Sequence, residues 1–208
     1  MTDGGTKAGE RVVNQDRRKF LTFATGATAA VGAVFAASPF VASWNLSERA
    51  KALGAPVSVD LSKIETGQMI TVVWRKQPIY IFKRTPAVVA GLVANDPRLK
   101  DPQSSESDQP TYATNERRSR RDDIAVLIAT CTHLGCLPKQ HFEPGDAELG
   151  ADWPGGFRCP CHGSRFDMAG RVFNGSPASV NLRIPPYSYP TETTLLIGQD
   201  ETATQGAA

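Results

Sequence analysis

The sequence predicts a mostly β protein that carries a single N-terminal transmembrane helix. Two observations support this: an uncharged apolar stretch near the N-terminus, and short β-branched and aromatic runs bounded by turn residues in the remainder. At 208 residues, with 40% hydrophobic and 21% charged residues, the chain suits one globular domain with appendages, or two small domains. The net charge of +2 and the scattered Lys and Arg residues give no indication of nucleic-acid binding.

The N-terminal region differs in composition from the rest of the chain. Residues 1–19 are polar and include five basic residues, whereas residues 20–47 carry no charge. About 20 apolar residues can span a bilayer core, so we expect a cytoplasmic N-terminus at 1–19 and a transmembrane anchor at 20–42. Basic residues ahead of an anchor place the bulk of the chain on the opposite side of the membrane.

The run DRRKFL (16–21) resembles a twin-arginine export signal, which carries folded proteins across the membrane. The alternative is that these basic residues are ordinary flanks of a membrane helix. A small-residue cleavage site could lie at 34–36, but the apolar run continues beyond it and favours an uncleaved anchor.

The rest of the chain predicts a flexible connector at 43–56, an outer domain at 57–198 and a tail at 199–208. Within the outer domain we expect strands, the first two forming a hairpin, at 69–74, 78–83, 124–130, 171–173 and 194–198. The segment 95–123 is charged, rich in Pro and Ser and without periodicity, so it predicts a long surface excursion. Residues 174–190 predict a turn-rich proline region.

Two six-residue motifs, CTHLGC (131–136) and CPCHGS (159–164), hold all four cysteines and two of the three histidines. Each short spacing lets one loop aim a Cys and a His at one centre. The candidate ligands are Cys131, His133, Cys159 and His162. If the loops face each other across a metal, Cys136 and Cys161 meet behind it, and in an exported domain they would pair as a disulfide. The third histidine, His141, lies in a polar loop and is expected to be solvated.

Three interpretations fit these residues. The first is a Rieske [2Fe–2S] cluster, with two cysteines on one iron and two histidines on the other. The second is a structural zinc site, and the third is a pair of disulfides with incidental histidines. Zinc fingers usually keep one ligand type in each short segment, whereas each segment here mixes Cys with His. Two chemically different irons would require that mixture, so the pattern favours the iron–sulfur cluster.

Both motifs resemble those of the Rieske iron–sulfur subunits of bacterial ubiquinol–cytochrome c oxidoreductases, the cytochrome bc complexes. Further resemblance covers roughly residues 14–198 and includes the twin-arginine anchor, WRKQPIYIFKRT (74–85), NGSPA (174–178) and NLRIPPY (181–187). It implies an antiparallel β-sandwich Rieske domain with a small cluster-binding subdomain at about 125–185. It also implies a single-pass protein of the bacterial inner membrane, with the C-terminal domain in the periplasm.

The resemblance also implies a role for individual residues. Cys131 and Cys159 would bind the buried iron. His133 and His162 would bind the outer iron. Cys136 and Cys161 would form a disulfide between the two loops. Ser164 would donate a hydrogen bond to a cluster sulfur, and Pro177 would belong to a proline loop covering the cluster. His162 would contact quinol, with Leu134 in the apolar docking tip.

One position departs from the family pattern. The family often has a Tyr two residues after the equivalent of Ser164, and its hydroxyl donates to a ligand sulfur, whereas this chain has Phe166. A missing donor stabilises the reduced cluster less, which predicts a lower potential than in Tyr-bearing relatives.

The implied activity is transfer of an electron and a proton from ubiquinol to the cluster, and of the electron to a membrane-bound c-type cytochrome. Cytochrome b would be a further partner in a dimeric, proton-translocating complex. The alternatives are the Rieske subunit of another exported oxidoreductase such as an arsenite oxidase, a Rieske ferredoxin or oxygenase domain, and a zinc-stabilised binding module. The anchor and the second cysteine pair argue against a ferredoxin or oxygenase.

Overall fold

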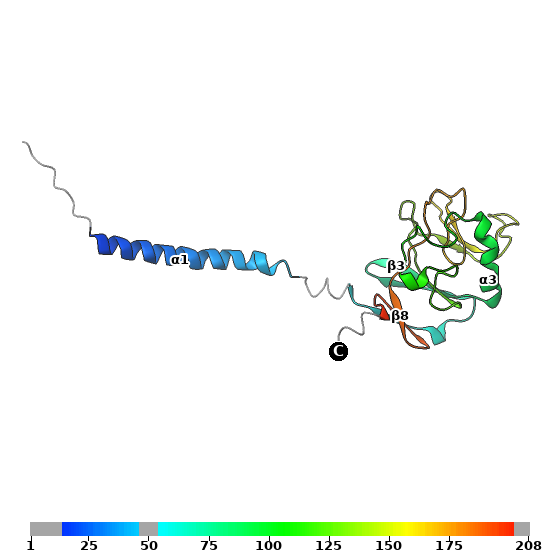
Figure 1. Cartoon of the computed structure of the whole chain (residues 1–208), viewed down its shortest axis with the longest axis horizontal. Coiled ribbons are helices and arrows are strands. Elements are labelled where there is room, and N and C mark those ends of the chain that lie inside the picture. The colour runs from blue at the N-terminus through cyan, green and yellow to red at the C-terminus, as the bar shows by residue number, and fades with distance from the viewer. Residues whose placement is uncertain (1–13, 46–53, 202–208) are drawn as a thin grey trace, which may run out of the picture. The chain divides into compact units, whose positions relative to one another are not determined.

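A computed structural model describes residues 14–45 and 54–201, which belong to two units that divide near residue 50 (Figure 1). Most of the predicted connector and tail, at 46–53 and 202–208, therefore lies outside the described residues. The first unit contains one helix, and the second, here called the β unit, contains all the described strands.

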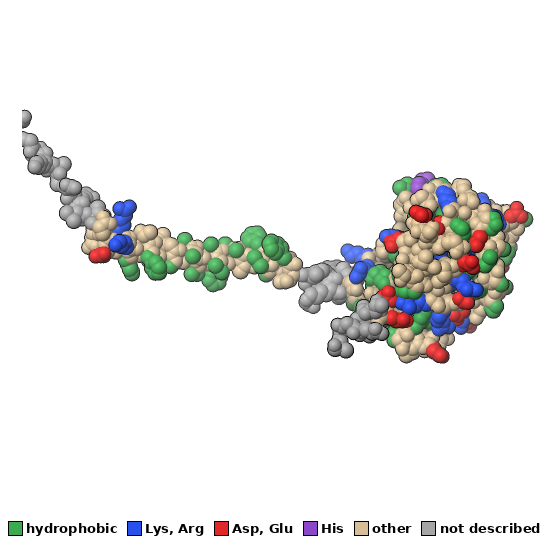
Figure 2. Space-filling view, viewed as in Figure 1, with side chains coloured by type: hydrophobic (Ala, Val, Ile, Leu, Met, Phe, Trp, Pro, Cys, Tyr) green, Lys and Arg blue, Asp and Glu red, His purple; other side chains and the backbone are tan. Residues whose placement is uncertain are grey.

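Helix α1 (Gln15–Ala42) begins earlier than the predicted anchor because Asn14 caps it. The Asn14 side chain accepts hydrogen bonds from the backbone N–H groups of Asp16 and Arg17, both at 3.1 Å. The basic residues of the twin-arginine motif therefore occupy the first turns of the helix. Figure 2 shows Lys and Arg side chains at this end and hydrophobic side chains along the rest. By length and composition, α1 could cross a membrane.

The β unit contains three antiparallel sheets of three strands each, which confirms the mostly β fold class. In sheet order, they are β1 (Val57–Asp60), β9 (Thr194–Ile197) and β8 (Tyr187–Thr191); β2 (Met69–Trp74), β3 (Gln77–Lys83) and β4 (Ile124–Ile128); and β5 (Lys139–His141), β6 (Gly156–Arg158) and β7 (Arg165–Phe166). The helical elements are α3 (Pro86–Gly91) and the 3-10 helices η1 (Leu61–Lys63), η2 (Val93–Arg98) and η3 (Thr111–Ala113).

Four of the five predicted strands are confirmed, whereas β8 begins inside the region predicted to be turn-rich, at 174–190. The predicted hairpin is confirmed as β2 and β3, and two further predicted strands are confirmed as β4 and β9. The strand predicted at 171–173 is wrong. Val172 and Phe173 form only isolated bridges, to Phe166 and to Leu99 respectively, so no ladder develops.

The core of the β unit lies beneath the two motifs. All five residues of β4 are buried, and the ring of Phe157 from β6 stacks on Tyr80 from β3 with centroids 5.5 Å apart. Cys131 and Cys159 belong to the same buried cluster. The packing of this core therefore supports the two cysteines directly, which favours a rigid site.

The segment 95–123 lies largely at the surface, as its composition predicts, but several of its residues are buried. Arg118 is fully buried, and its guanidinium donates to the carbonyls of Ala169 and Gly170 and to the side chain of Gln109. Backbone carbonyls thus satisfy a buried cation, an arrangement that composition does not reveal. Other buried members of the segment are Asn95, Leu99, Asp101, Ser104, Ala113 and Ser119.

The stretch between the two motifs packs against this segment. Leu99 forms a small second core with Leu149, Trp153 and Phe173. His141 is not solvated as expected: it lies on β5, its Nδ1 is 2.9 Å from a carboxylate oxygen of Asp146, and its carbonyl accepts a hydrogen bond from Trp153 Nε1. The segment 95–123 and the stretch between the two motifs therefore stabilise each other through this second core.

Candidate metal centre

The two motifs form loops with the same backbone hydrogen bonds, the first between β4 and β5 and the second between β6 and β7. The N–H of Cys131 donates to the carbonyl of residue 136, and that of Cys159 to the carbonyl of residue 164. Four residues after these cysteines, Gly135 and Gly163 donate back to their carbonyls. Both glycines have positive φ angles, 82° and 76°, which residues with a Cβ rarely adopt. The sequence thus builds two matching loops around the predicted ligand cysteines.

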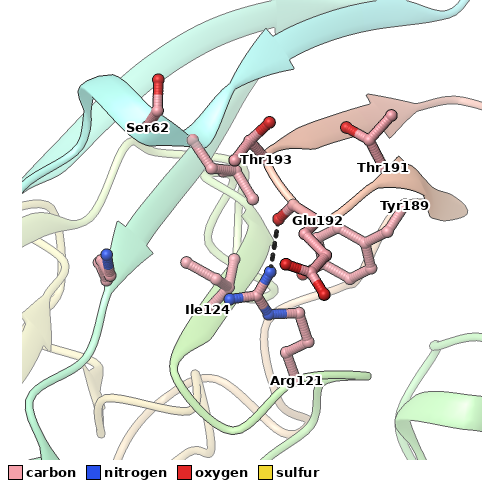
Figure 3. A pocket seen from close by; sticks show the side chains of 9 residues that line it. Ser62, Arg121, Ile124, Tyr189, Thr191, Glu192 and Thr193 are labelled. Atoms are coloured by element: carbon pink, nitrogen blue, oxygen red, sulfur yellow. Dashed lines mark hydrogen bonds between the residues drawn. The ribbon is translucent and has the colours of Figure 1, made fainter.

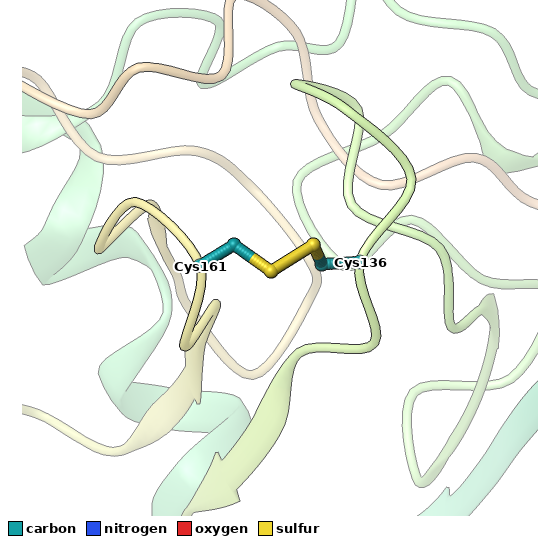
Figure 4. The surroundings of a disulfide bond; sticks show 2 residues. All are labelled: Cys136 and Cys161. Atoms are coloured by element: carbon teal, nitrogen blue, oxygen red, sulfur yellow. A yellow bond between two sulfur atoms is a disulfide. The ribbon is translucent and has the colours of Figure 1, made fainter.

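The four cysteines divide into two pairs. Cys136 and Cys161 form a disulfide that joins the two loops, with Cα atoms 6.6 Å apart (Figure 4). Cys131 and Cys159 are buried and free, and their thiols interact directly. The interpretation with two disulfides is therefore wrong, and one pair of thiols is left for a metal.

The histidines of the motifs lie side by side. The rings of His133 and His162 have centroids 4.9 Å apart and are nearly perpendicular. His133 Nδ1 is buried and has no hydrogen-bond partner among the described residues, whereas the His162 side chain is exposed. An unpartnered buried nitrogen is costly, and metal ligation would remove that cost.

These residues fit a group that takes two thiolates and two imidazoles. The Sγ atoms of Cys159, Cys136 and Cys161 also lie within 4.8 Å of one another. Sulfurs joined in a disulfide offer no thiolate, so these three cysteines do not form a second metal site. Their proximity shows that the disulfide lies beside the predicted ligand Cys159. Burial raises the pKa of the Cys131 thiol, while the contacts with the His133 backbone and the Ser164 hydroxyl act in the opposite direction. A cation at this position would favour the thiolate form.

The proline loop, residues 174–180, contacts both motif loops. The fully buried Ser164 accepts a hydrogen bond at its Oγ from the N–H of Ala178, at 3.0 Å. Thr132 donates from its hydroxyl to the carbonyl of Val180, at 2.7 Å. Pro177, directly before Ala178, is exposed. The loop therefore contacts both motif loops, and its covering of the cluster stays a prediction.

Exposed apolar residues lie on the loop of the first motif, which the disulfide joins to the loop of the exposed His162. Leu134 is 69% exposed, as expected for a docking tip, and sequence reasoning missed Leu137, which is 50% exposed. Leu137 directly follows Cys136 in the sequence, and this position next to the first motif could have indicated that it lies near the centre. Figure 2 shows a histidine beside hydrophobic side chains at one end of the β unit. Exposed apolar residues around a polar group are typical of a binding surface.

The most prominent hollow of the β unit lies apart from the two motifs. A hollow of about 700 Å3 in the β unit is lined by residues that include Ser62, Arg121, Tyr189 and Glu192 (Figure 3). None of the motif residues lines it. Two of its lining residues contact each other: the Arg121 guanidinium donates a hydrogen bond to the Glu192 carbonyl, at 2.8 Å.

Comparison with known proteins identifies the family. Residues 100–187 match the model of the Rieske [2Fe-2S] domain, and residues 8–47 match "Ubiquitinol-cytochrome C reductase Fe-S subunit TAT signal". The ubiquinol-cytochrome c reductase iron-sulfur subunit of Allochromatium vinosum is 51% identical over 90% of this chain and 91% of its own length. The chain belongs to the ubiquinol-cytochrome c reductase iron-sulfur subunit family. Subunits with the same name from Bradyrhizobium diazoefficiens and Rhodospirillum rubrum are 43% and 42% identical, each over 88% of this chain and 94% and 91% of their own lengths.

Membership of this family decides between the interpretations of the motifs. The cofactor is a Rieske [2Fe–2S] cluster, and the zinc interpretation is set aside. The N-terminal match confirms the twin-arginine signal. Together with the apolar helix α1, the family indicates a single-pass membrane anchor. The names of the relatives agree with the quinol enzyme and not with an arsenite oxidase.

The Phe166→Tyr variant is expected to have a higher cluster potential. Phe166 is fully buried on β7, in the same cluster as Cys131 and Cys159, and the resemblance implies that a hydroxyl at this position donates to a ligand sulfur. A hydrogen bond of about 1 kcal/mol to a sulfur shifts a one-electron couple by about 40 mV. Redox titration monitored by circular dichroism would measure this shift. Phe173→Tyr, in the second core, is the control, and an unchanged potential in Phe166→Tyr would contradict the prediction.

Proposed function

We propose that this chain is the electron-transfer subunit of a quinol–cytochrome c reductase complex. The observation that carries the proposal is the pair of buried free thiols in the two motifs whose histidine rings, His133 and the exposed His162, lie side by side, with exposed leucines on the first motif's loop. This arrangement presents one polar group at an apolar surface and keeps the predicted sulfur ligands away from water.

When bound, the [2Fe–2S] cluster supplies a one-electron acceptor. Cys131 and Cys159 would hold it on the buried side, and His133 and His162 on the outer side. The outer ring nitrogen of His162 would accept a hydrogen bond from the quinol hydroxyl and take its proton. Leu134 and Leu137 would exclude water from this contact, because their side chains are apolar and exposed. The residues of this chain thus position quinol and receive its proton.

The proposal includes the place of the chain in its complex. Ubiquinol is the substrate, cytochrome b and a membrane-bound c-type cytochrome are the partner subunits, and the complex is dimeric and proton-translocating. The twin-arginine signal and the basic first turns of α1 support a cytoplasmic N-terminus in the bacterial inner membrane. The β unit would then lie in the periplasm, where a disulfide persists.

Low-temperature EPR of the dithionite-reduced, full-length protein tests this function first. We expect a rhombic signal with a low average g-value, typical of a cluster with mixed Cys and His ligands. Addition of ubiquinol to the oxidised complex should produce the same signal without dithionite. A silent sample that contains stoichiometric zinc and no iron would refute electron transfer as the function.

A further inference from the structure

We propose that Lys100 is a positioning residue that holds the proline loop against the metal centre. The inference rests on the proposed function, because it concerns the same centre. Lys100 belongs to the segment 95–123, for which the sequence alone suggests no role. Three sets of contacts connect it to the loop and to the predicted ligands.

The backbone of Lys100 lies beside the segment that enters the proline loop. Its N–H donates to the carbonyl of Val172 at 3.0 Å, and the N–H of Asn174 donates to the carbonyl of Arg98 at 2.8 Å. Between these bonds, Leu99 forms an antiparallel bridge to Phe173, and both side chains are buried in the second core. The backbone of Lys100 is therefore fixed where the loop begins.

The ammonium group of Lys100 binds the loop itself. Nζ donates to the carbonyl of Ser176 at 2.7 Å and to the carbonyl of Ala178 at 2.8 Å. These carbonyls lie on either side of Pro177, which has no N–H with which to stabilise the loop. A charged donor forms stronger hydrogen bonds than a neutral one. Lys100 therefore supplies hydrogen-bond donors to a loop in which the proline has none.

The held loop in turn contacts the centre. The N–H of Ala178, the residue whose carbonyl Lys100 binds, donates to Ser164 Oγ at 3.0 Å. The carbonyl of Ser164 accepts a hydrogen bond from the N–H of the predicted ligand Cys159, at 2.7 Å. On the other side of Pro177, the Ser176 hydroxyl accepts from the N–H of Arg165 at 3.0 Å. Lys100 therefore acts on the centre through Ala178 and Ser164, and touches neither a predicted ligand nor the quinol contact.

Hydrogen–deuterium exchange of the full-length holoprotein tests the positioning role. In Lys100→Met, the amides of residues 174–180 are expected to exchange about tenfold faster, because the loop loses its charged hydrogen bonds. Lys63→Met is the matched control: both lysines are exposed, but Lys63 on η1 makes only a loose ion pair with Asp60, at 3.8 Å. Exchange in the control should equal that of the wild type.

The cluster potential provides the second measurement. Lys100→Met should lower it, because a nearby cation and an oriented Ser164 are both lost, and Lys100→Arg should restore part of it. Unchanged exchange in Lys100→Met would overturn the proposal. A lower potential with unchanged exchange would also overturn it, because Lys100 would then act only as a charge. Absence of the Rieske signal from the wild type would instead refute the proposed function, and the exchange result would stand separately.

Discussion

The His133→Asn variant is expected to contain no [2Fe–2S] cluster. His133 Nδ1 is buried without a hydrogen-bond partner among the described residues, and its ring lies 4.9 Å from that of His162. Asparagine fits the space but supplies no imidazole nitrogen, so the outer iron would lose one of its two protein ligands. Iron content, visible absorption and the EPR signal should all fall to background, and the assembled complex should lose quinol oxidation.

The third histidine provides a matched control for this result. His141 lies on β5 between the two motifs in sequence, but it pairs with Asp146 and takes no part in the centre. His141→Asn should retain the iron, the spectrum and the activity. If His133→Asn retained a normal Rieske signal, or if His141→Asn lost it, the proposed ligand set would be wrong.

The sequence was sufficient for the parts of the molecule that carry a strong local pattern. Cys and His in two short motifs identified the centre because such ligands are uncommon and their spacing is specific. The uncharged stretch identified α1, although the cap formed by Asn14 moved its start to Gln15. Runs of β-branched and aromatic residues identified the β2–β3 hairpin.

The remaining features depend on contacts between distant segments. Strands β5, β6 and β7 have only two or three residues each, too few for a periodic pattern. The polar composition of 95–123 predicts a surface loop, yet the burial of Arg118 depends on carbonyls at 169 and 170. Lys100 binds carbonyls 76 and 78 positions further along the chain. No local rule indicates such partners, so the support of the proline loop appeared only in the structure.

Removal of the disulfide is expected to destabilise the β unit and shorten the lifetime of the cluster. In the double variant Cys136→Ser with Cys161→Ser, the two motif loops lose their covalent link across a sequence separation of 25 residues. Loop-closure entropy gives a loss of about 3 kcal/mol in the free energy of unfolding, or a fall of about 10 °C in Tm for a domain of this size. Both residues are replaced because a single free thiol could pair with the nearby Cys159.

The cluster should be affected more than the fold. Its predicted ligands come from both loops, and each loop keeps its own backbone hydrogen bonds and strands when the disulfide is removed. Separation of the loops would therefore release iron before the β unit unfolds, and decay of the visible spectrum should precede the loss of β signal in circular dichroism during heating. A mild reductant should shift wild-type protein towards the same behaviour and leave the double variant unchanged. Equal Tm and equal cluster lifetime in variant and wild type would show that the proline loop alone, held through Ser164 and Thr132, keeps the two motifs together.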